Sequence, residues 1–345
     1  MTLSAKLVNN MTSYYQNKNI LITGGAGFIG SNLAITLAAK KANVMIVDAL
    51  IDGYGGNLFN IEPVKKNLRL EIVDIRDTAK MDKLVCNQDI IFNLAGTLSH
   101  VDSMKDPLTD LDINCRAQLS LLESVRKYNP SAKIIFAGTR NQYGKAKYLP
   151  VDENHPQEPT DINGINCIAA EKYHLMYTKV YAVKTISLRM TNTFGPRHQM
   201  KHSRQGVLNW FIRKIIDGEE VVLYGKGKQI RDVNYVDDVV SALLLVGQSS
   251  KGWGEAYNLG GTPVSLLDFV KKTIDIVKSL QNEVRPRKGI VMKPFPVDRK
   301  NIEIGDYVAS YEKIKKVFGW RPKVSLEEGI RRTINYYAKY KEFYY

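Results

Sequence analysis

Three glycines and a later aspartate form the most chemically informative pattern in the chain. The stretch Ile20–Gly30 (ILITGGAGFIG) places Gly24, Gly27 and Gly30 between an apolar run and residues that recur at helical spacing. Such glycines permit a tight turn, close approach of the backbone to a pyrophosphate, and close packing of the next helix, whose N-terminus attracts phosphate. Asp48 ends the following apolar run. An acid there accepts hydrogen bonds from an adenosine ribose and repels a 2′-phosphate, which favours NAD over NADP.

The elements that must position this loop alternate between apolar runs and amphipathic segments. We expect strands near 20–22, 44–48, 68–74, 89–94, 133–137 and 185–189, and helices near 78–85, 106–128 and 164–181. This alternation predicts an α/β fold with a doubly wound parallel sheet. Ligands of such sheets bind beyond the carboxyl ends of the strands. The polar and glycine-rich segments fall at those ends, at Thr23–Gly30, Asp48, Asp74, Leu94–Thr97, Thr139 and Thr191–Asn192.

The second half of the chain indicates a smaller α/β domain that closes over the crevice. From about Asn192 the segments become shorter and prolines separate them. We expect residues 18–191 and about 229–250 to form the cofactor-binding domain, 192–228 and 251–337 the smaller domain, and 1–17 an N-terminal extension. The tyrosine-rich end, 336–345, is expected to be a helix packed on the body.

Bulk properties exclude several classes of protein. The 345 residues are 44% hydrophobic and 24% charged, which is typical of a globular protein. Lys and Arg produce a net charge of +14 without a long basic run, so we expect a basic surface that attracts an anionic ligand and no nucleic-acid site. The three cysteines form no CxxC pair, which favours a reducing compartment and no structural metal. No apolar run suits a membrane span and residues 1–17 lack a signal-peptide core, so we expect a cytoplasmic protein without a membrane partner.

Several motifs, in order, resemble those of the extended short-chain dehydrogenase/reductase family, and within it the nucleotide-sugar epimerases and dehydratases. The matching segments are Thr23–Gly30, Asp74–Ile75, Asn93–Gly96, Asp106–Pro107, Asp112–Asn114, Thr139 with Tyr143–Gly144, Arg189–Pro196, Gly225–Asp232, Tyr235–Asp238, Tyr257–Gly260 and Gly319–Pro322. The resemblance implies a Rossmann-type sheet that holds NAD tightly. It assigns cofactor contacts to Gly24, Gly27, Phe28, Ile29, Gly30, Asp48, Asp74, Ile75, Leu94, Ala95, Gly96, Asn114 and Thr191.

The resemblance also implies a mechanism, from which this chain departs. In the family a sugar gives a hydride to NAD and recovers it, while a Tyr with a Lys four residues later accepts the hydroxyl proton and a Ser or Thr, here Thr139, shares the proton path. The frame ending in Glu171 places Asn163 and Cys167 at the Tyr and Lys positions. Asn does not titrate, and a free Cys thiol has a pKa of about 8.5. A literal Tyr-x-x-x-Lys occurs at 143–147, but it is expected in a loop and not on the helix.

Three interpretations of this departure remain open. Another group could serve as the base, namely Tyr143, His100 or a Cys167 thiolate favoured by the nicotinamide charge. The chain could instead bind NAD and a nucleotide sugar without redox chemistry. Cys167 could also be an altered position in a chain whose relatives carry Lys there.

The substrate side favours epimerisation of a nucleotide-diphosphate sugar. Dehydratases of the family carry an Asp-Glu pair directly after the Thr, whereas this chain has Arg140 and Asn141 and so lacks an acid to expel a hydroxyl. The resemblance places substrate contacts at Asn192, Tyr224, Arg231 and Arg299, and we also expect His100 and Arg140 to contact the substrate. It also implies a homodimer, in which the helices that begin near 106 and 164 form a two-fold four-helix bundle.

Overall fold

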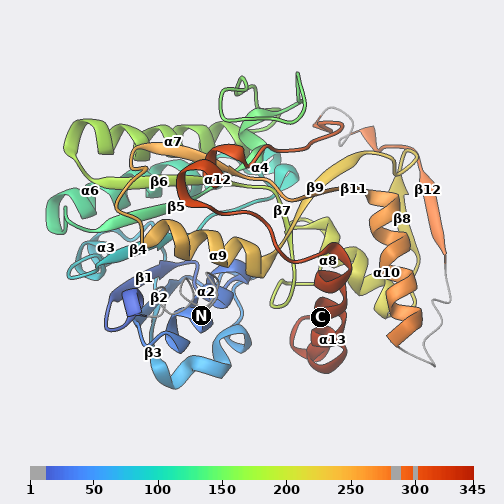
Figure 1. The fold of residues 1–345 in the computed structure, drawn as a ribbon, viewed down its shortest axis with the longest axis horizontal. Helices are drawn as coiled ribbons and strands as arrows, with labels where there is room; N and C mark the ends of the chain where they lie inside the picture. Colours follow the sequence, from blue (N-terminus) through green and yellow to red (C-terminus); the bar gives the residue numbers. More distant parts are fainter. Residues whose placement is uncertain (1–12, 281–288, 298–301) are drawn as a thin grey trace.

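A seven-stranded parallel sheet forms the centre of the computed structural model, which describes residues 13–280, 289–297 and 302–345. The strand order is β10-β6-β5-β4-β1-β2-β3, and each neighbouring pair is parallel (Figure 1). The strands are β1 (Asn19–Thr23), β2 (Asn43–Asp48), β3 (Leu68–Ile72), β4 (Ile90–Asn93), β5 (Lys133–Thr139), β6 (Lys184–Met190) and β10 (Glu255–Leu259). The order reverses between β1 and β4, as the doubly wound prediction requires.

Helices cover both faces of this sheet. Successive residues of β1 alternate, so that Ile20 and Ile22 enter one buried apolar cluster and Leu21 enters another. The first cluster contains residues of α2 (Phe28–Ala39) and α9 (Val236–Gly247), and the second contains residues of α3 (Thr78–Leu84), α6 (Ala117–Tyr128) and α7 (Ile162–Tyr181). Figure 1 shows α6 and α7 on one side of the sheet and α9 on the other. The predicted α/β fold is therefore confirmed.

A smaller layered unit follows the large sheet. Its strands are β7 (Asn192–Phe194), β9 (Ile230–Tyr235) and β11 (Thr262–Ser265), which form one sheet, and β8 (Val221–Tyr224) and β12 (Ile290–Lys293), which form another. Its helices are α8 (Val207–Ile216), α10 (Leu266–Leu280) and α13 (Leu326–Tyr340), whereas α12 (Glu312–Phe318) packs against β10 of the large sheet. Two strands belong to a different sheet from the one that the expected domain boundaries imply. β10 joins the large sheet through β6, and β9 joins the small one, because sheet membership depends on distant partners that local patterns do not specify.

The long helix expected at 106–128 is interrupted. The chain forms α4 (His100–Lys105), α5 (Pro107–Leu111) and a π-helical turn, η2 (Asp112–Arg116), before α6. Asp106 caps α5, since its carboxylate accepts a hydrogen bond from the Thr109 N–H at 3.1 Å, and Pro107 occupies the first helical position. The remaining short helices are η1 (Leu58–Asn67), η3 (Arg140–Tyr143) and η4 (Lys341–Phe343).

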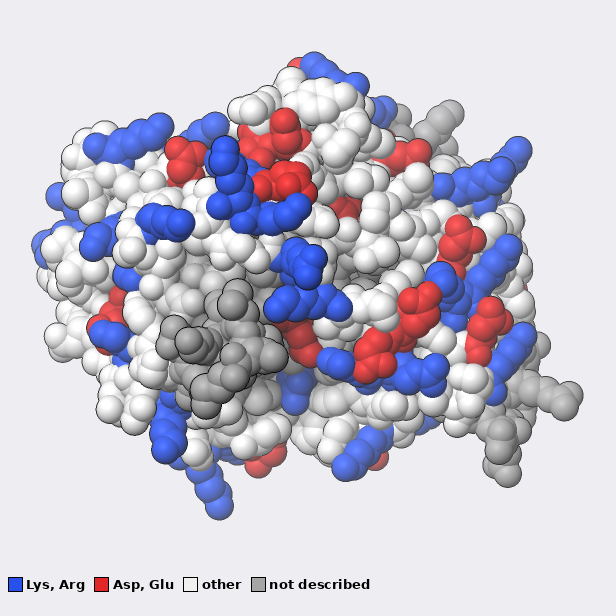
Figure 2. Space-filling model, viewed as in Figure 1, with Lys and Arg blue, Asp and Glu red and all other residues white. Residues whose placement is uncertain are grey.

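The tyrosine-rich end packs on the body as expected. Tyr337 in α13 and Tyr344 after η4 are both buried, and the hydroxyl of Tyr344 donates to Asn60 at 2.7 Å. None of the described helices is long and apolar enough to cross a membrane. Figure 2 shows Lys and Arg dispersed among Asp and Glu over one face, without a continuous basic stripe.

Candidate active site

A cavity of about 1070 Å³ lies at the carboxyl ends of the central strands and extends to the smaller unit. All thirteen residues predicted to contact the cofactor line it: Gly24, Gly27, Phe28, Ile29, Gly30, Asp48, Asp74, Ile75, Leu94, Ala95, Gly96, Asn114 and Thr191. The predicted substrate residues His100, Arg140, Asn192, Tyr224 and Arg231 line it too. Arg299 lies outside the described residues. The structure therefore gathers into one cavity residues that the sequence spreads over two hundred positions.

The glycine loop leaves no room for side chains at two points. Gly24 has a φ of +66°, and a Cβ atom built on it would lie 3.0 Å from the backbone of Ala95. A Cβ atom on Gly30 would lie 2.3 Å from the carbonyl oxygen of Gly24. Both positions therefore require glycine for the loop and the start of α2 to approach each other. The resulting cradle at a helix N-terminus fits a pyrophosphate.

Asp48 lies at the end of β2, beside this cradle. Its two carboxylate oxygens accept hydrogen bonds from the backbone N–H groups of Ala26, at 3.0 Å, and Leu50, at 2.9 Å. Burial raises the pKa of this carboxyl above its ordinary value, although the two hydrogen bonds oppose the effect. Each oxygen has a second lone pair with which it can accept a ribose hydroxyl. Asp48 is thus held in a position that fits an adenosine ribose.

Asn163, at the position of the usual Tyr, is fully buried and is not among the residues that line the cavity. Its Nδ2 donates to the carbonyl oxygen of Thr97 at 2.8 Å and to Asp110 at 3.0 Å. Its Oδ1 accepts a hydrogen bond from Asn141 at 3.4 Å. These contacts tie α7 to the loop after β4. The geometry therefore fits an anchoring role for Asn163 and not the predicted catalytic one.

Cys167 lines the cavity but is poorly suited to act as a base. Its side chain is buried, and its Sγ lies 3.9 Å from the Oδ1 of Asn163. Burial, followed by the negative charges of Asp110, Asp161 and Glu171, raises the pKa of the thiol well above its usual value. The surrounding residues therefore favour the neutral thiol and do not themselves support the thiolate interpretation. The same carboxylates would suit a cation, which fits the interpretation that Cys167 occupies a lysine position.

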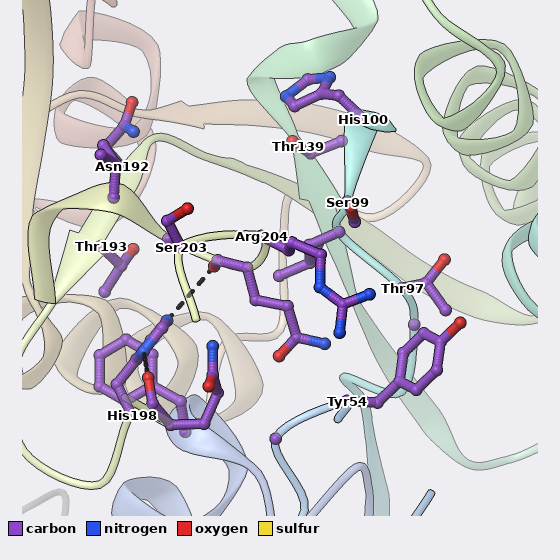
Figure 3. A pocket seen from close by; sticks show the side chains of 18 of the residues that line it. Tyr54, Thr97, Ser99, His100, Thr139, Asn192, Thr193, His198, Ser203 and Arg204 are labelled. Carbon is purple, nitrogen blue, oxygen red and sulfur yellow. Dashed lines mark hydrogen bonds between the residues drawn. The ribbon is translucent and has the colours of Figure 1, made fainter. Parts of the chain in front are cut away.

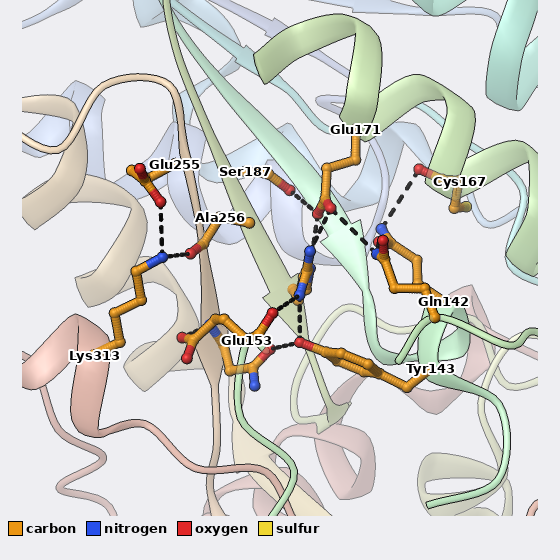
Figure 4. A network of polar contacts seen from close by, with 12 residues as sticks. Gln142, Tyr143, Glu153, Cys167, Glu171, Ser187, Glu255, Ala256 and Lys313 are labelled. Carbon is orange, nitrogen blue, oxygen red and sulfur yellow. Dashed lines mark hydrogen bonds and ion pairs between the residues drawn. The ribbon is translucent and has the colours of Figure 1, made fainter. Parts of the chain in front are cut away.

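Tyr143 is a buried structural residue and not the predicted alternative base. Its hydroxyl donates to Asn258 at 2.7 Å and accepts a hydrogen bond from Arg189, which pairs with Glu171 (Figure 4). Burial raises the pKa of Tyr143 to about 12, although the Arg189 charge opposes it. The side chain is fully buried and does not line the cavity. No substrate hydroxyl in the cavity would reach this phenol.

We expect Tyr143→Phe to affect stability and not catalysis. Removing the hydroxyl leaves Asn258 and Arg189 short of a partner, which costs about 1–3 kcal/mol of the free energy of unfolding. Denaturant unfolding measures this change, and Tyr148→Phe is the control because Tyr148 is exposed. Turnover per folded molecule should stay within about two-fold of the wild type. A hundred-fold loss of kcat with unchanged stability would instead support a catalytic role for Tyr143.

His100 combines exposure to the cavity with a buried carboxylate partner. It is the first residue of α4, and its Nδ1 contacts a carboxylate oxygen of Asp161. Figure 3 shows the imidazole close to Thr139, where both lie beside the cavity. About 30% of the His100 side chain is exposed, whereas the Asp161 side chain is only 1% exposed. With Nδ1 donating to Asp161, Nε2 is the nitrogen left to accept a proton.

Asp161 is held by the start of α7 and was not among the site residues predicted from the sequence. Its other oxygen accepts a hydrogen bond from the Gly164 N–H at 2.8 Å, which makes it the N-cap of the helix. Burial acts to raise the pKa of this carboxyl, but the hydrogen bond and charge of His100 outweigh it and lower the pKa. The carboxylate is therefore ionised. The signal available in the sequence was an aspartate three residues before the expected start of a helix.

The substrate side of the cavity is cationic and aromatic. Arg231 pairs with Glu303 at 2.6 Å and donates to the carbonyl oxygen of Gly305. Tyr224 lies against Phe295, with ring centroids 5.8 Å apart. Glu303 and Phe295 line the cavity but were not predicted from the sequence, because both occur in a segment without recognisable motifs.

Comparisons with known proteins agree with this arrangement. The GDP-mannose 4,6 dehydratase family matches residues 21–333. A putative UDP-glucose 4-epimerase of Methanocaldococcus jannaschii is 34% identical, over 92% of this chain and 97% of its own. The crystal structure of a Thermotoga maritima UDP-glucose 4-epimerase with UDP-glucose has a TM-score of 0.83 and 33% identity, covering 94% of this chain and 99% of that one. A Thermus thermophilus UDP-glucose 4-epimerase in complex with NAD has a TM-score of 0.80 and 29% identity, covering 93% and 99%.

Proposed function

Because this chain belongs to the extended short-chain dehydrogenase/reductase family of nucleotide-sugar epimerases and dehydratases, we propose that it is an NAD-dependent nucleotide-sugar epimerase that acts through a transient keto-sugar. The glycine cradle and Asp48 support NAD as the cofactor. When bound, NAD supplies the site that accepts and returns the sugar hydride. The work of the chain is to orient the sugar and to move its hydroxyl proton.

The observation that carries the proposal is the pair of His100 and Asp161 at the cavity. Asp161 holds the Nδ1 proton of the imidazole, so that Nε2 accepts the proton of the sugar hydroxyl as the carbonyl forms. Thr139, at the end of β5, shares this proton path through its hydroxyl. The pair thereby takes over the task that a Tyr and a Lys perform elsewhere in the family. The return of the proton and hydride on the other face of the carbon completes the epimerisation.

Epimerisation fits the site better than dehydration. Loss of a hydroxyl needs a general acid beside the leaving oxygen. The two residues after Thr139 are Arg140, a guanidinium, and Asn141, an amide whose Nδ2 donates to Asn163. Neither can deliver a proton to a leaving hydroxyl at neutral pH. A dehydratase or dehydrogenase of the same family remains the alternative reaction.

A second candidate function is binding without turnover. The buried Asn163 and the neutral Cys167 thiol favour it, because the usual proton acceptor of the family is missing. Such a protein would hold NAD and a nucleotide sugar as a sensor or scaffold. Substrate-dependent reduction of the bound nicotinamide separates the two candidates.

The test begins with the purified chain. We expect bound NAD to be released on denaturation, and at least one of a panel of UDP-, CDP-, dTDP- and GDP-sugars to be converted to its epimer. Rapid-mixing absorbance should detect transient reduced nicotinamide, and chromatography with NMR should identify the product sugar. Bound NAD without reduction by any sugar would favour the binding protein. A deoxy-keto product would favour the dehydratase.

We also propose that the chain forms a homodimer through α5 and α7. Leu108 on α5 is 71% exposed, and Ile165 and Val180 on α7 are 53% and 61% exposed. Met176, eleven residues after Ile165, lies on the same face of α7 and extends this apolar surface. Exposed apolar side chains that gather on neighbouring helices typically mark an interface. The four-helix bundle expected from the family resemblance supports a second copy of this chain as the partner.

We expect the double variant Ile165→Glu, Val180→Glu to be monomeric at micromolar concentration. Two desolvated charges at the centre of an interface should raise the dimer dissociation constant by at least about 30-fold. Light scattering coupled to size exclusion measures the mass. Met292→Glu, at a residue of β12 that is 45% exposed, should leave the dimer intact. A double variant with unchanged mass would contradict this interface.

A further inference from the structure

Arg140 carries a charge that no residue of the described chain neutralises by an ion pair. It follows Thr139 directly and lines the cavity. Its Nε donates to the Oδ1 of Asn192 at 3.1 Å, and its guanidinium lies 5.3 Å from the centre of the Tyr307 ring. Its Nη1 is shielded from solvent and has no hydrogen-bond partner. An unsatisfied guanidinium nitrogen is costly, so this arrangement fits a site that receives an anion.

The surrounding charges are already committed. Arg231 lies near enough to repel Arg140, but it is itself paired with Glu303. Asp161 is bonded to His100, and both oxygens of Asp232 accept backbone hydrogen bonds, from Gly261 at 2.6 Å and Ala309 at 2.8 Å. Burial and then the Arg231 charge lower the pKa of Arg140 to about 10, which still leaves it cationic at neutral pH. Among the described residues no carboxylate is left to pair with Arg140, which favours a ligand as the source of the countercharge.

The position of Arg140 suggests which part of the ligand supplies this charge. Arg140 follows Thr139 in the sequence, and its side chain contacts Asn192. Figure 3 shows Thr139 beside His100. If His100 accepts the hydroxyl proton, the sugar ring lies against these residues. The anion that meets Arg140 is then a substituent of the ring. A planar guanidinium matches a carboxylate in two parallel hydrogen bonds.

We propose that Arg140 binds a carboxylate on the sugar, so that the substrate class is a nucleotide-diphosphate uronic acid. This inference rests on the proposed epimerase function and adds the identity of the sugar. A carboxylate at C6 leaves no hydroxyl to be expelled from that carbon, which agrees with the absence of a dehydratase acid pair. An uncharged hydroxymethyl group would leave the cation unpaired, and the site would discriminate against it.

Calorimetric titration of the NAD-loaded protein with UDP, UDP-glucose and UDP-glucuronate tests the proposal. We expect UDP-glucuronate to bind about 10- to 100-fold more tightly than UDP-glucose, as a charge-assisted contact implies. Arg140→Met keeps the length of the stem against Tyr307 and should abolish this preference while leaving UDP affinity within about three-fold. Arg140→Lys, which retains the charge, should restore part of it. Thermal unfolding verifies that the variants fold.

The alternative source of the anion is the pyrophosphate itself. If Arg140→Met weakens UDP as much as it weakens UDP-glucuronate, the guanidinium is a phosphate contact and the inference is overturned. Equal binding of both sugars by the wild type overturns it as well, while the epimerase proposal survives. If UDP itself does not bind, the titration is repeated with the nucleotide whose sugar the panel shows to be converted, and the inference is overturned if the uronic acid of that nucleotide binds no more tightly than its neutral sugar.

Discussion

His100→Gln is expected to lower kcat for the nucleotide sugar by about 10²- to 10⁴-fold, the usual contribution of a positioned general base. Glutamine retains a hydrogen-bonding group near Asp161 but accepts no proton from a hydroxyl. NAD content and sugar affinity should change little, because the imidazole contributes proton transfer and not the cofactor cradle. Rapid-mixing absorbance of reduced nicotinamide measures the step directly. A loss of less than three-fold would remove His100 from the reaction.

Asp161→Asn separates positioning from helix capping. Asparagine caps helices as well as aspartate does, so the hydrogen bond from Gly164 can persist. The variant loses only the negative charge against His100. We therefore expect a fall in kcat of about ten-fold or more without loss of α7. Asp77→Asn, at the N-cap of α3, is the matched control and should leave kcat unchanged.

The same carboxylate predicts a pH dependence of stability. The folded pKa of Asp161 is lower than its value of 3.8 in the unfolded chain, so the unfolded state binds the proton more readily. Its contribution to the free energy of unfolding is therefore present above about pH 4 and is lost as the pH falls through the folded value. The stability difference between the wild type and Asp161→Asn should shrink over that interval.

Gly30→Ala should lower the affinity for NAD by at least about 100-fold. The added Cβ would lie 2.3 Å from the Gly24 carbonyl oxygen and 2.8 Å from the Gly25 Cα, and neither backbone atom can move without displacing the loop. The pyrophosphate would then lose several backbone N–H groups at once. Titration of the stripped protein with NAD measures the loss.

Gly289→Ala is the control for this substitution. A Cβ on Gly289 meets nothing within 4 Å, so the change tests only the general effect of replacing glycine by alanine. It should leave NAD binding unchanged. A Gly30→Ala protein that purifies with a full complement of NAD would contradict the role assigned to the cradle.

Local pattern was sufficient for the cofactor half of the site. The glycine loop is contiguous, Asp48 ends β2 and Asp74 follows β3, so their positions depend on elements that short stretches specify. Parallel strands place their carboxyl ends at one edge, and all thirteen predicted contacts consequently line one cavity. The interruption at Asp112–Arg116 was missed because a π-turn depends on contacts such as that between Asn114 and Thr97.

The catalytic half required the tertiary structure. From the sequence, Tyr143 was a candidate for the catalytic base. In the structure its hydroxyl donates a hydrogen bond to Asn258, 115 positions away. His100 and Asp161 are 61 positions apart, and no local pattern connects them. Their pairing depends on how α4 packs against the start of α7, which only long-range contacts decide.

The sequence by itself determined a doubly wound fold, a dinucleotide cradle and the loss of the usual Tyr and Lys, because these features are written in contiguous residues and regular spacing. Only the tertiary structure shows which groups are available in their place. Burial raises the pKa of the Cys167 thiol, and the side chain of Asn163 is occupied by hydrogen bonds such as that to Thr97. His100 faces the cavity and contacts the ionised carboxylate of Asp161. Burial and partnership are properties of packing between distant segments, so they become visible only once the chain is folded.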